Sequence, residues 1–327
     1  MKIGNNIYVE TVYPGVNVGC IVADRGSVCV DTPLLPGEAQ RWQARIRSLK
    51  GEPVRFVVYT NGQRDRILGT QYLIHSIPAP PSPSAALLSS QPDPRQRPRQ
   101  RLGLRQHPEP KKEQRVRKGV VVAHKLAWAQ VTSHRTDNFK QSMIDMLGER
   151  DPDIINLQII RPQVALDEDL ELHIGDEKVT LLAAAPGMLW VWYPEQSVLF
   201  VGDTVVVGTH PPLMVTNTKK WLVALERLRY EPQFQDAVVV PGRGSLCDTS
   251  AAETLIEYLS LAREGTREIY RTGRSKADLN GVAADLLPLY AVADGQRERV
   301  QRQIKLGLDD LYDEFKAADA ANSGDGH

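Results

Sequence analysis

Three places in the sequence combine a short apolar run with an abrupt loop of polar residues or glycine. The runs begin at Val57, Val198 and Val238. Apolar, β-branched runs of this length are typical of buried strands, and side chains at the ends of such strands are well placed to form a functional site. The chain is therefore expected to be an α/β protein that carries its functional residues at strand ends.

Short strand-like runs and helical segments alternate along the rest of the chain. Strands are predicted over 7–12, 17–23, 27–31, 54–60, 120–123, 170–174, 179–184, 189–192, 198–201 and 237–240. Helices are predicted over 37–49, 125–131, 219–228 and 250–272, and a last one carries Val300, Ile304, Leu308, Leu311 and Phe315 on one stripe. Two β-rich halves, each followed by helices, predict two packed sheets with helices on their outer faces, a four-layer αββα sandwich.

One segment interrupts this pattern. Residues 78–118 contain nine prolines, no aromatic residue, and ten basic against three acidic side chains, a net charge of +7. Such a composition cannot bury enough apolar surface to offset the entropy of ordering, which predicts a disordered insert. A basic arm for nucleic acid is an alternative, although no aromatic residues interleave the charges.

The composition as a whole excludes several classes of protein. The net charge is zero because the remaining residues balance the insert with −7, which argues against a broad nucleic-acid-binding surface. Three cysteines cannot form a disulfide framework, and neither a signal sequence nor a membrane span is visible. We expect a cytoplasmic protein that does not bind membranes.

Five segments together resemble the metallo-β-lactamase superfamily in order and spacing. Residues 60–66 with Gly69 are similar to the family's T-H-x-H-x-D-H loop, 184–188 to H-T-P-G-S, 198–203 to L-F-x-G-D, 238–244 to V-V-P-G-H-G, and 17–32 to the opening strands. The resemblance implies one metallo-β-lactamase-type domain over 1–77 and 119–316, interrupted by the insert and followed by a flexible tail, 317–327.

The resemblance also implies a dinuclear metal site, usually zinc, held by five histidines and two aspartates. The equivalent positions in this chain are Asn61, Gln63, Asp65, Arg66, Ala184, Asp203 and Arg243. Only Asp65 and Asp203, the candidate catalytic residues, keep a ligating group. Alanine has no donor atom, and arginine cannot be deprotonated to coordinate a cation. We expect no metal cofactor; zinc would be expected only if the site were not degenerate.

The replacements suggest what took the place of the metals. Without a cation, Asp65 and Asp203 would repel each other, which would raise the pKa of one. Arg66 and Arg243 could supply the missing positive charge through bidentate contacts. We hypothesise that an Asp/Arg cluster clamps the two sheets together; the alternative, in which these residues lie apart in solvent, stays open. A small anionic ligand between Arg66 and Arg243 is also compatible with the sequence.

Other conspicuous residues have structural interpretations. We expect His210 to be a loop histidine near the mouth of the site, and Cys247 is given little weight as a nucleophile. Trp190 and Trp192 should share one face of a sheet and pack there. Asp31, at the end of a strand, should cap the turn into the next helix.

The sequence favours a non-catalytic pseudo-enzyme with a binding or regulatory role. Two alternatives stay open: a hydrolase of a thioester, lactone or phosphoester with an atypical or mononuclear site, and nucleic-acid binding through the insert. The final helix should either pack on the domain or mediate a homodimer.

Overall fold

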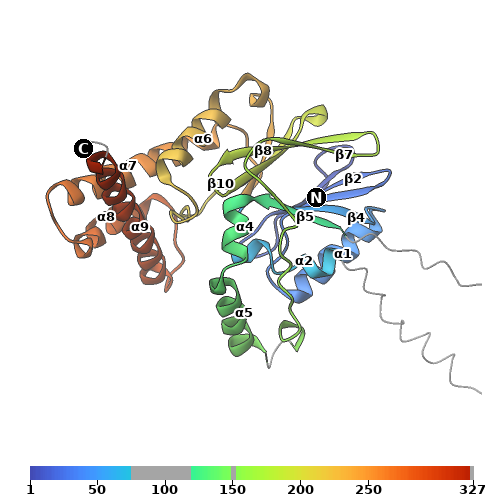
Figure 1. Cartoon of the computed structure of the whole chain (residues 1–327), viewed down its shortest axis with the longest axis horizontal. Coiled ribbons are helices and arrows are strands. Elements are labelled where there is room, and N and C mark those ends of the chain that lie inside the picture. The colour runs from blue at the N-terminus through green and yellow to red at the C-terminus, as the bar shows by residue number, and fades with distance from the viewer. Residues whose placement is uncertain (75–118, 149–151, 325–327) are drawn as a thin grey trace, which may run out of the picture.

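Two β-sheets face each other at the centre of the computed structural model, which describes residues 1–74, 119–148 and 152–324 (Figure 1). The first sheet contains β1 (Ile7–Glu10), β2 (Val18–Ala23), β3 (Gly26–Val30), β4 (Val54–Tyr59), β5 (Val120–His124) and β6 (Val164–Leu166), in that order. β1 to β3 form an antiparallel meander, and β3 to β6 are parallel.

The second sheet is mostly antiparallel. It contains β7 (Leu170–Ile174), β8 (Glu177–Ala185), β9 (Met188–Tyr193), β10 (Val198–Val206) and β11 (Val238–Arg243). Only β10 and β11 pair in parallel. The carboxyl ends of β10 and β11 therefore lie at one edge of their sheet, where side chains that follow the two strands can meet.

Helices cover the outer face of each sheet, which gives the predicted four-layer architecture. Over the first sheet lie α1 (Pro36–Ser48), α2 (Thr70–Ile74), α4 (Lys125–Val131) and α5 (His134–Leu147). Over the second lie α6 (Thr218–Tyr230), α7 (Ala251–Arg271), α8 (Leu279–Leu286) and α9 (Arg297–Gly324). None of the helices in the described ranges is both long enough and apolar enough to cross a membrane.

The two inner faces form an apolar core between the sheets. Val28 and Val58 from the first sheet pack with Leu181, Val191 and Phe200 from the second. Since each strand buries alternate side chains on this face, the register of both sheets is fixed by burial.

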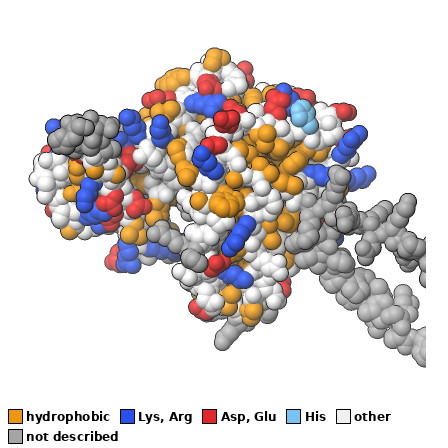
Figure 2. Space-filling model, viewed as in Figure 1, with side chains coloured by type: hydrophobic (Ala, Val, Ile, Leu, Met, Phe, Trp, Pro, Cys, Tyr) orange, Lys and Arg blue, Asp and Glu red, His pale blue; other side chains and the backbone are white. Residues whose placement is uncertain are grey.

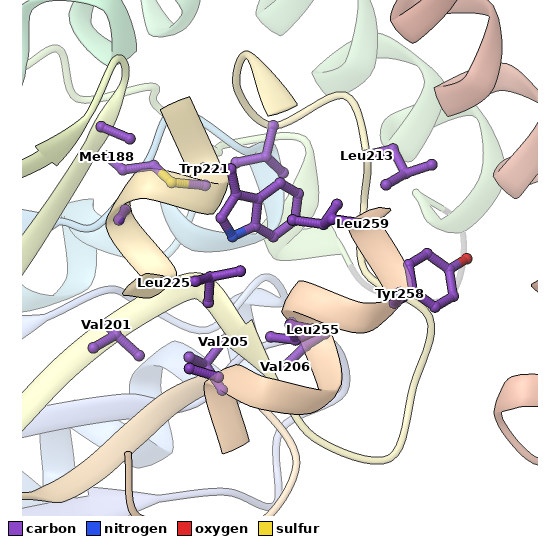
Figure 3. Close-up of a cluster of buried hydrophobic side chains, with 14 of the residues drawn as sticks. Met188, Val201, Val205, Val206, Leu213, Trp221, Leu225, Leu255, Tyr258 and Leu259 are labelled. Carbon is purple, nitrogen blue, oxygen red and sulfur yellow. The ribbon is translucent and has the colours of Figure 1, made fainter. Parts of the chain in front are cut away.

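A larger core joins the second sheet to its helices (Figure 3). Trp221 and Leu225 of α6 and Leu255 and Leu259 of α7 lie against Val205 of β10. Ile304, Leu308 and Leu311 of α9 are buried in the same core. The final helix therefore packs on the domain, which is the first of the two roles expected for it.

The structure differs from the sequence prediction in several helices and one strand. The helix α5 was not expected, although Phe139, Met143 and Ile144 pack on the core of the first sheet. The strand β6 and the helix α8 were also not expected. Finally, α9 continues to Gly324, past the predicted end of the domain at residue 316, because the alanine-rich segment that follows favours helix. The predicted insert, 78–118, lies outside the described residues.

Candidate functional site

The candidate site lies where the carboxyl ends of β3 and β4 in the first sheet meet β10 and the end of β11 in the second. Asp31 follows β3, Arg66 follows β4 in a short 3₁₀ helix (Arg64–Arg66), Asp203 lies within β10, and Arg243 ends β11. We call Asp31, Asp65, Arg66, Asp203 and Arg243 the ion-pair cluster. Both sheets contribute to it, so its contacts connect the two halves of the sandwich.

Arg66 is the centre of the ion-pair cluster. Its side chain is fully buried, and its Nη1 donates a hydrogen bond of 2.9 Å to Oδ2 of Asp31. Its Nε donates to Oδ2 of Asp203 at 3.1 Å, and its Nη2 donates to Oδ1 of the same carboxylate. The guanidinium therefore grips Asp203 with two donors, as arginine does in bidentate ion pairs. Burial by itself would lower the pKa of Arg66, but Asp203 and Asp31 hold it above its usual value.

Arg243 binds the same carboxylate from the other side. Its Nε donates to Oδ1 of Asp203 at 3.1 Å, and its Nη2 donates to Oδ2 of Asp65 at 2.7 Å. The side chains of Arg243 and Asp65 are half-buried, at 27% and 22% exposure. Arg243 thus joins the two aspartates that keep a ligating group. The carboxylate of Asp203 stands between the two guanidinium groups, where the sequence suggested an anionic ligand.

Asp203 is held in its ionised form by these donors. Burial raises the pKa of a carboxyl, but the attraction of Arg66 and Arg243 outweighs it and lowers the pKa of Asp203 to about 2. Asn61 adds a further hydrogen bond, from its Nδ2 to Oδ2 of Asp203 at 3.1 Å. The repulsion expected between Asp65 and Asp203 does not raise the pKa of Asp203, since the two arginines outweigh it.

Two glycines let the backbone approach this cluster. A Cβ at Gly242 would lie 2.4 Å from Oδ1 of Asp203 and 2.5 Å from Nη2 of Arg66. Gly202 has a φ of +53°, and a Cβ there would lie 2.2 Å from Oγ1 of Thr60. Side chains at these positions would push the two strands away from the cluster, which explains why both positions are glycine.

The prediction for Asp31 was wrong. Asp31 does not cap a helix: the residue before α1 is Leu35, which makes no side-chain cap. Instead, Asp31 accepts hydrogen bonds from the backbone N and the hydroxyl of Thr60, at 2.8 and 2.6 Å, and from Arg66. Because β3 and β4 are parallel neighbours, their carboxyl ends place Asp31 beside the loop that holds Arg66. That topology was the signal that could have placed Asp31 in the cluster.

Three of the predicted positions lie outside the ion-pair cluster, and of these only Asn61 has a side chain that bonds to it. The backbone N of Gln63 donates to Oδ1 of Asn61 at 2.9 Å, but Gln63 itself lines a neighbouring cavity. Ala184 lines a different cavity, beside His124 at the end of β5. Hydrogen bonds therefore join Asn61, Asp65, Arg66, Asp203 and Arg243, whereas the side chains of Gln63 and Ala184 make no such bond to them within the described residues.

The residues at these positions do not fit the metal centre that the resemblance implies. No group of three or more His, Cys, Asp or Glu side chains in the described part of the chain is placed to hold a metal ion. Arginine nitrogens are donors without a free lone pair, and two guanidinium groups occupy the space around the carboxylate of Asp203. A metal ion would have to displace both of them.

A cavity of about 600 Å³ lies beside the loop that precedes Arg66. It is lined by Gly62, Gln63, Arg64, Leu126, Ala129, Gln130, Ser133, Met214 and Asp310. Leu126 and Met214 are 46% and 54% exposed, and Figure 2 shows apolar side chains at the surface over α4. The cavity thus lies between the site loop, α4 and α9, with an apolar wall and polar groups at its edge.

His124 is a buried residue that the sequence analysis missed. Its Nδ1 accepts hydrogen bonds from the backbone N of Leu126 and of Gly187, both at 3.1 Å. The first bond caps α4, and the second ties the end of β5 to the turn between β8 and β9. A neutral ring with its proton on Nε2 is required to accept both bonds. Its only sequence signal was its place directly after an apolar strand.

Replacing His124 by asparagine is expected to flatten the pH dependence of the free energy of unfolding between about pH 7 and about pH 5. Burial lowers the pKa of His124 below its usual 6.5. Below pH 6.5 the histidine takes up a proton in the unfolded chain but not in the folded chain. Its contribution to stability is therefore fully present above pH 6.5, and the free energy of unfolding decreases as the pH is lowered, by up to about 1.4 kcal/mol per pH unit. Urea unfolding at several pH values measures the slope.

The matched control is His173→Asn, because His173 is exposed on β7. This variant shows what the loss of an exposed histidine does to the slope, so that the effect of the buried position can be separated from it. His210, which lies against Tyr258 and Tyr290 and whose pKa is also lowered by burial, contributes equally in both variants. A wild-type slope in His124→Asn would contradict the assignment.

The remaining sequence predictions concern residues away from the cluster. Trp190 and Trp192 both pack edge-on against Phe234, as expected for sheet packing. The backbone of Cys247 forms a β-bridge with Val239, and the residue lines a separate pocket. Burial raises the pKa of its thiol to about 12. A thiol with so high a pKa is a poor nucleophile, which agrees with the small weight given to it.

Comparisons with known proteins agree with this architecture. The sequence profile of the Metallo-beta-lactamase superfamily matches residues 14–243. A metallo-beta-lactamase family protein from Thermus thermophilus is similar in structure, with a TM-score of 0.60, 13% identity, and 97% of this chain and 94% of that chain covered. A beta-lactamase domain protein from Burkholderia ambifaria has a TM-score of 0.54 and 14% identity, with 94% and 86% covered. No curated protein sequence matches the chain significantly.

Proposed function

The chain belongs to the metallo-beta-lactamase superfamily, and we propose that it is a member without a metal centre that has a binding or regulatory role in place of hydrolysis. The ion-pair cluster takes the position of the metal site and holds the two sheets together. The cavity beside the site loop then serves to bind a ligand without reacting with it.

The observation that carries this proposal is the burial of Arg66. Its guanidinium has no exposed surface, and its donors are bound by Asp31, Asp203 and the carbonyl oxygen of Gly242. A buried guanidinium is stable only while its counter-charges stay in place, because an unpaired charge in the interior is very costly. Arg66 therefore fills a position that a metal ligand would have to vacate, and it does so as part of a closed network.

The same network accounts for the loss of hydrolytic chemistry. Hydrolases of this kind use a metal-bound hydroxide as the attacking group. In the ion-pair cluster, the carboxylate of Asp203 is saturated by donors and its pKa is about 2, so it is a poor general base near neutral pH. Asp65 is bound by Arg243. Asp203 is therefore not available as the base, and Oδ1 of Asp65 is the only carboxylate oxygen of the cluster without a hydrogen-bond partner in the described ranges.

Elemental analysis of the protein tests this proposal. After incubation with excess zinc, iron(II) or manganese and removal of free metal, we expect far less than stoichiometric metal, because both guanidinium groups would have to be displaced. A zinc-binding protein of the same fold, treated in parallel, is the control. Thioester, lactone and phosphodiester substrates should not be turned over. Stoichiometric metal, or metal-dependent turnover, would overturn the proposal in favour of an atypical hydrolase.

A further inference from the structure

A second cavity, of about 380 Å³, lies beside the position where Ala184 replaces a family metal ligand. It is formed by the start of α4, the end of β8 and the first turn of α6. It is lined by His124, Lys125, Leu126, Asp167, Ala183, Ala184, Ala185, Pro186 and Lys220. Its size lies in the range of small-molecule sites, which start near about 300 Å³.

The polar group that points to a ligand here is the imidazole of His124. The side chain is 6% exposed, and both bonds to its Nδ1 come from backbone N–H groups. The proton of this neutral ring is therefore on Nε2, which donates no hydrogen bond to the described residues and is not completely enclosed by them. His124, which lines the cavity, thus carries a donor that is held in place and has no partner among the described residues.

We propose that this cavity binds a small aliphatic carboxylate, with its oxygens on Nε2 of His124 and the ammonium group of Lys220. The charges around the cavity favour a monoanion. Lys125 is paired with Asp167, whereas Lys220 forms no ion pair with any side chain in the described ranges. One unpaired cation and one neutral donor match a single negative charge better than the two charges of phosphate.

The rest of the wall suits a short acyl chain. Ala183, Ala184 and Ala185 form one side, and Leu126 and Pro186 form another. The hydroxyl of Thr216 donates to the carbonyl oxygen of Pro186 at 2.7 Å, which fixes the turn that closes this side. Ala184 itself lines this space, and its short side chain adds an apolar surface where the family places a polar metal ligand.

This inference deepens the proposed binding role by naming a ligand class, but it does not depend on the state of the ion-pair cluster. Metal in the cluster would overturn the proposed function and leave carboxylate binding to be decided by its own test. Absence of carboxylate binding would overturn this inference and leave the metal analysis unaffected.

Titration of the full-length protein with sodium butyrate tests the inference by calorimetry and by NMR of the histidine rings. We expect saturable binding with a Kd of about 1 mM, a reasonable affinity for a ligand of this size. The ring resonances of His124 should shift, and those of exposed His173 should not. Sodium phosphate, at equal ionic strength, should bind more weakly than butyrate.

The matched variants are Lys220→Gln and Lys219→Gln, on adjacent exposed positions of the first turn of α6. Only Lys220 lines the cavity. We expect Lys220→Gln to weaken butyrate binding about tenfold, the effect of losing one charge-assisted hydrogen bond near solvent, and Lys219→Gln to bind as the wild type does. No saturation, equal effects of the two variants, an unmoved His124 or tighter binding of phosphate would each overturn the inference.

Discussion

Replacing Arg66 by methionine is expected to lower the free energy of unfolding by about 3–5 kcal/mol, the cost of breaking one side of a buried ion pair. The variant leaves the carboxylates of Asp31 and Asp203 in the interior without the cation that both of them contact. Methionine has a similar length and fills the space, so the loss reports charge and hydrogen bonding more than packing. Urea unfolding at neutral pH measures it.

Arg64→Met is the matched control, because Arg64 belongs to the same 3₁₀ helix but is exposed. Its guanidinium lies 4.8 Å from the ring centroid of Phe139, a contact that contributes about 0.5–1 kcal/mol at an exposed site. Arg66→Lys, which keeps the charge but cannot bridge two carboxylates, should fall between the two variants. If Arg66→Met loses no more free energy of unfolding than Arg64→Met does, the cluster does not hold the two sheets together.

Most of the fold could be predicted because its strands are apolar runs with loops of polar residues or glycine between them. Burial leaves a strong pattern in β4 and β10, and both were predicted, although β10 was predicted only over its first four residues, 198–201. The helix α5 was missed because its buried residues are diluted by polar ones, although Phe139, Met143 and Leu147 recur at helical spacing. Local patterns therefore identify elements better when one of their faces is completely buried.

The site was only partly predictable, because sequence similarity gives positions but not contacts. Arg66 and Arg243 could be assigned to the cluster since they stand where the family places metal ligands. Asp31 could not, because its role depends on the parallel pairing of β3 with β4. Gln63 and Ala184 occupy ligand positions by sequence yet line separate cavities. Without a shared metal ion, as proposed above, the side chains at these positions need not converge on one point.

The two aspartates that share Arg66 are expected to lose different amounts of stability when each is neutralised. Asp203→Asn should lower the free energy of unfolding by about 2–3 kcal/mol, since a carboxyl whose pKa falls from 3.8 to about 2 gains about that much from its surroundings. The amide would also turn an N–H group toward the donors of Arg66 and Arg243. Asp31→Asn should cost less, because burial outweighs the attraction of Arg66 and raises the pKa of Asp31.

Asparagine at position 31 can keep part of the contacts there, although its amide nitrogen would replace Oδ2, which accepts from the hydroxyl of Thr60 and from Nη1 of Arg66. Its side-chain oxygen can accept from the backbone N of Thr60, as one carboxylate oxygen of Asp31 does. Asp31 has a φ of +53°, a left-handed conformation that asparagine tolerates better than most residues. Asp31→Asn is therefore a control of the same chemistry, on the same arginine, in an equally buried place.

The stability changes caused by the two substitutions should depend on pH in opposite directions. The folded pKa of Asp203 is depressed, so its contribution is present above 3.8 and is lost as the pH falls toward about 2. The stability gap between wild type and Asp203→Asn should narrow over that window. The folded pKa of Asp31 is raised above 3.8. The wild type therefore gains stability relative to Asp31→Asn as the pH falls through that raised pKa. Unfolding midpoints of the three proteins, measured from above the raised pKa of Asp31 down to about pH 2, show both trends. If the two trends run in the same direction, the arginines do not hold Asp203 in preference to Asp31.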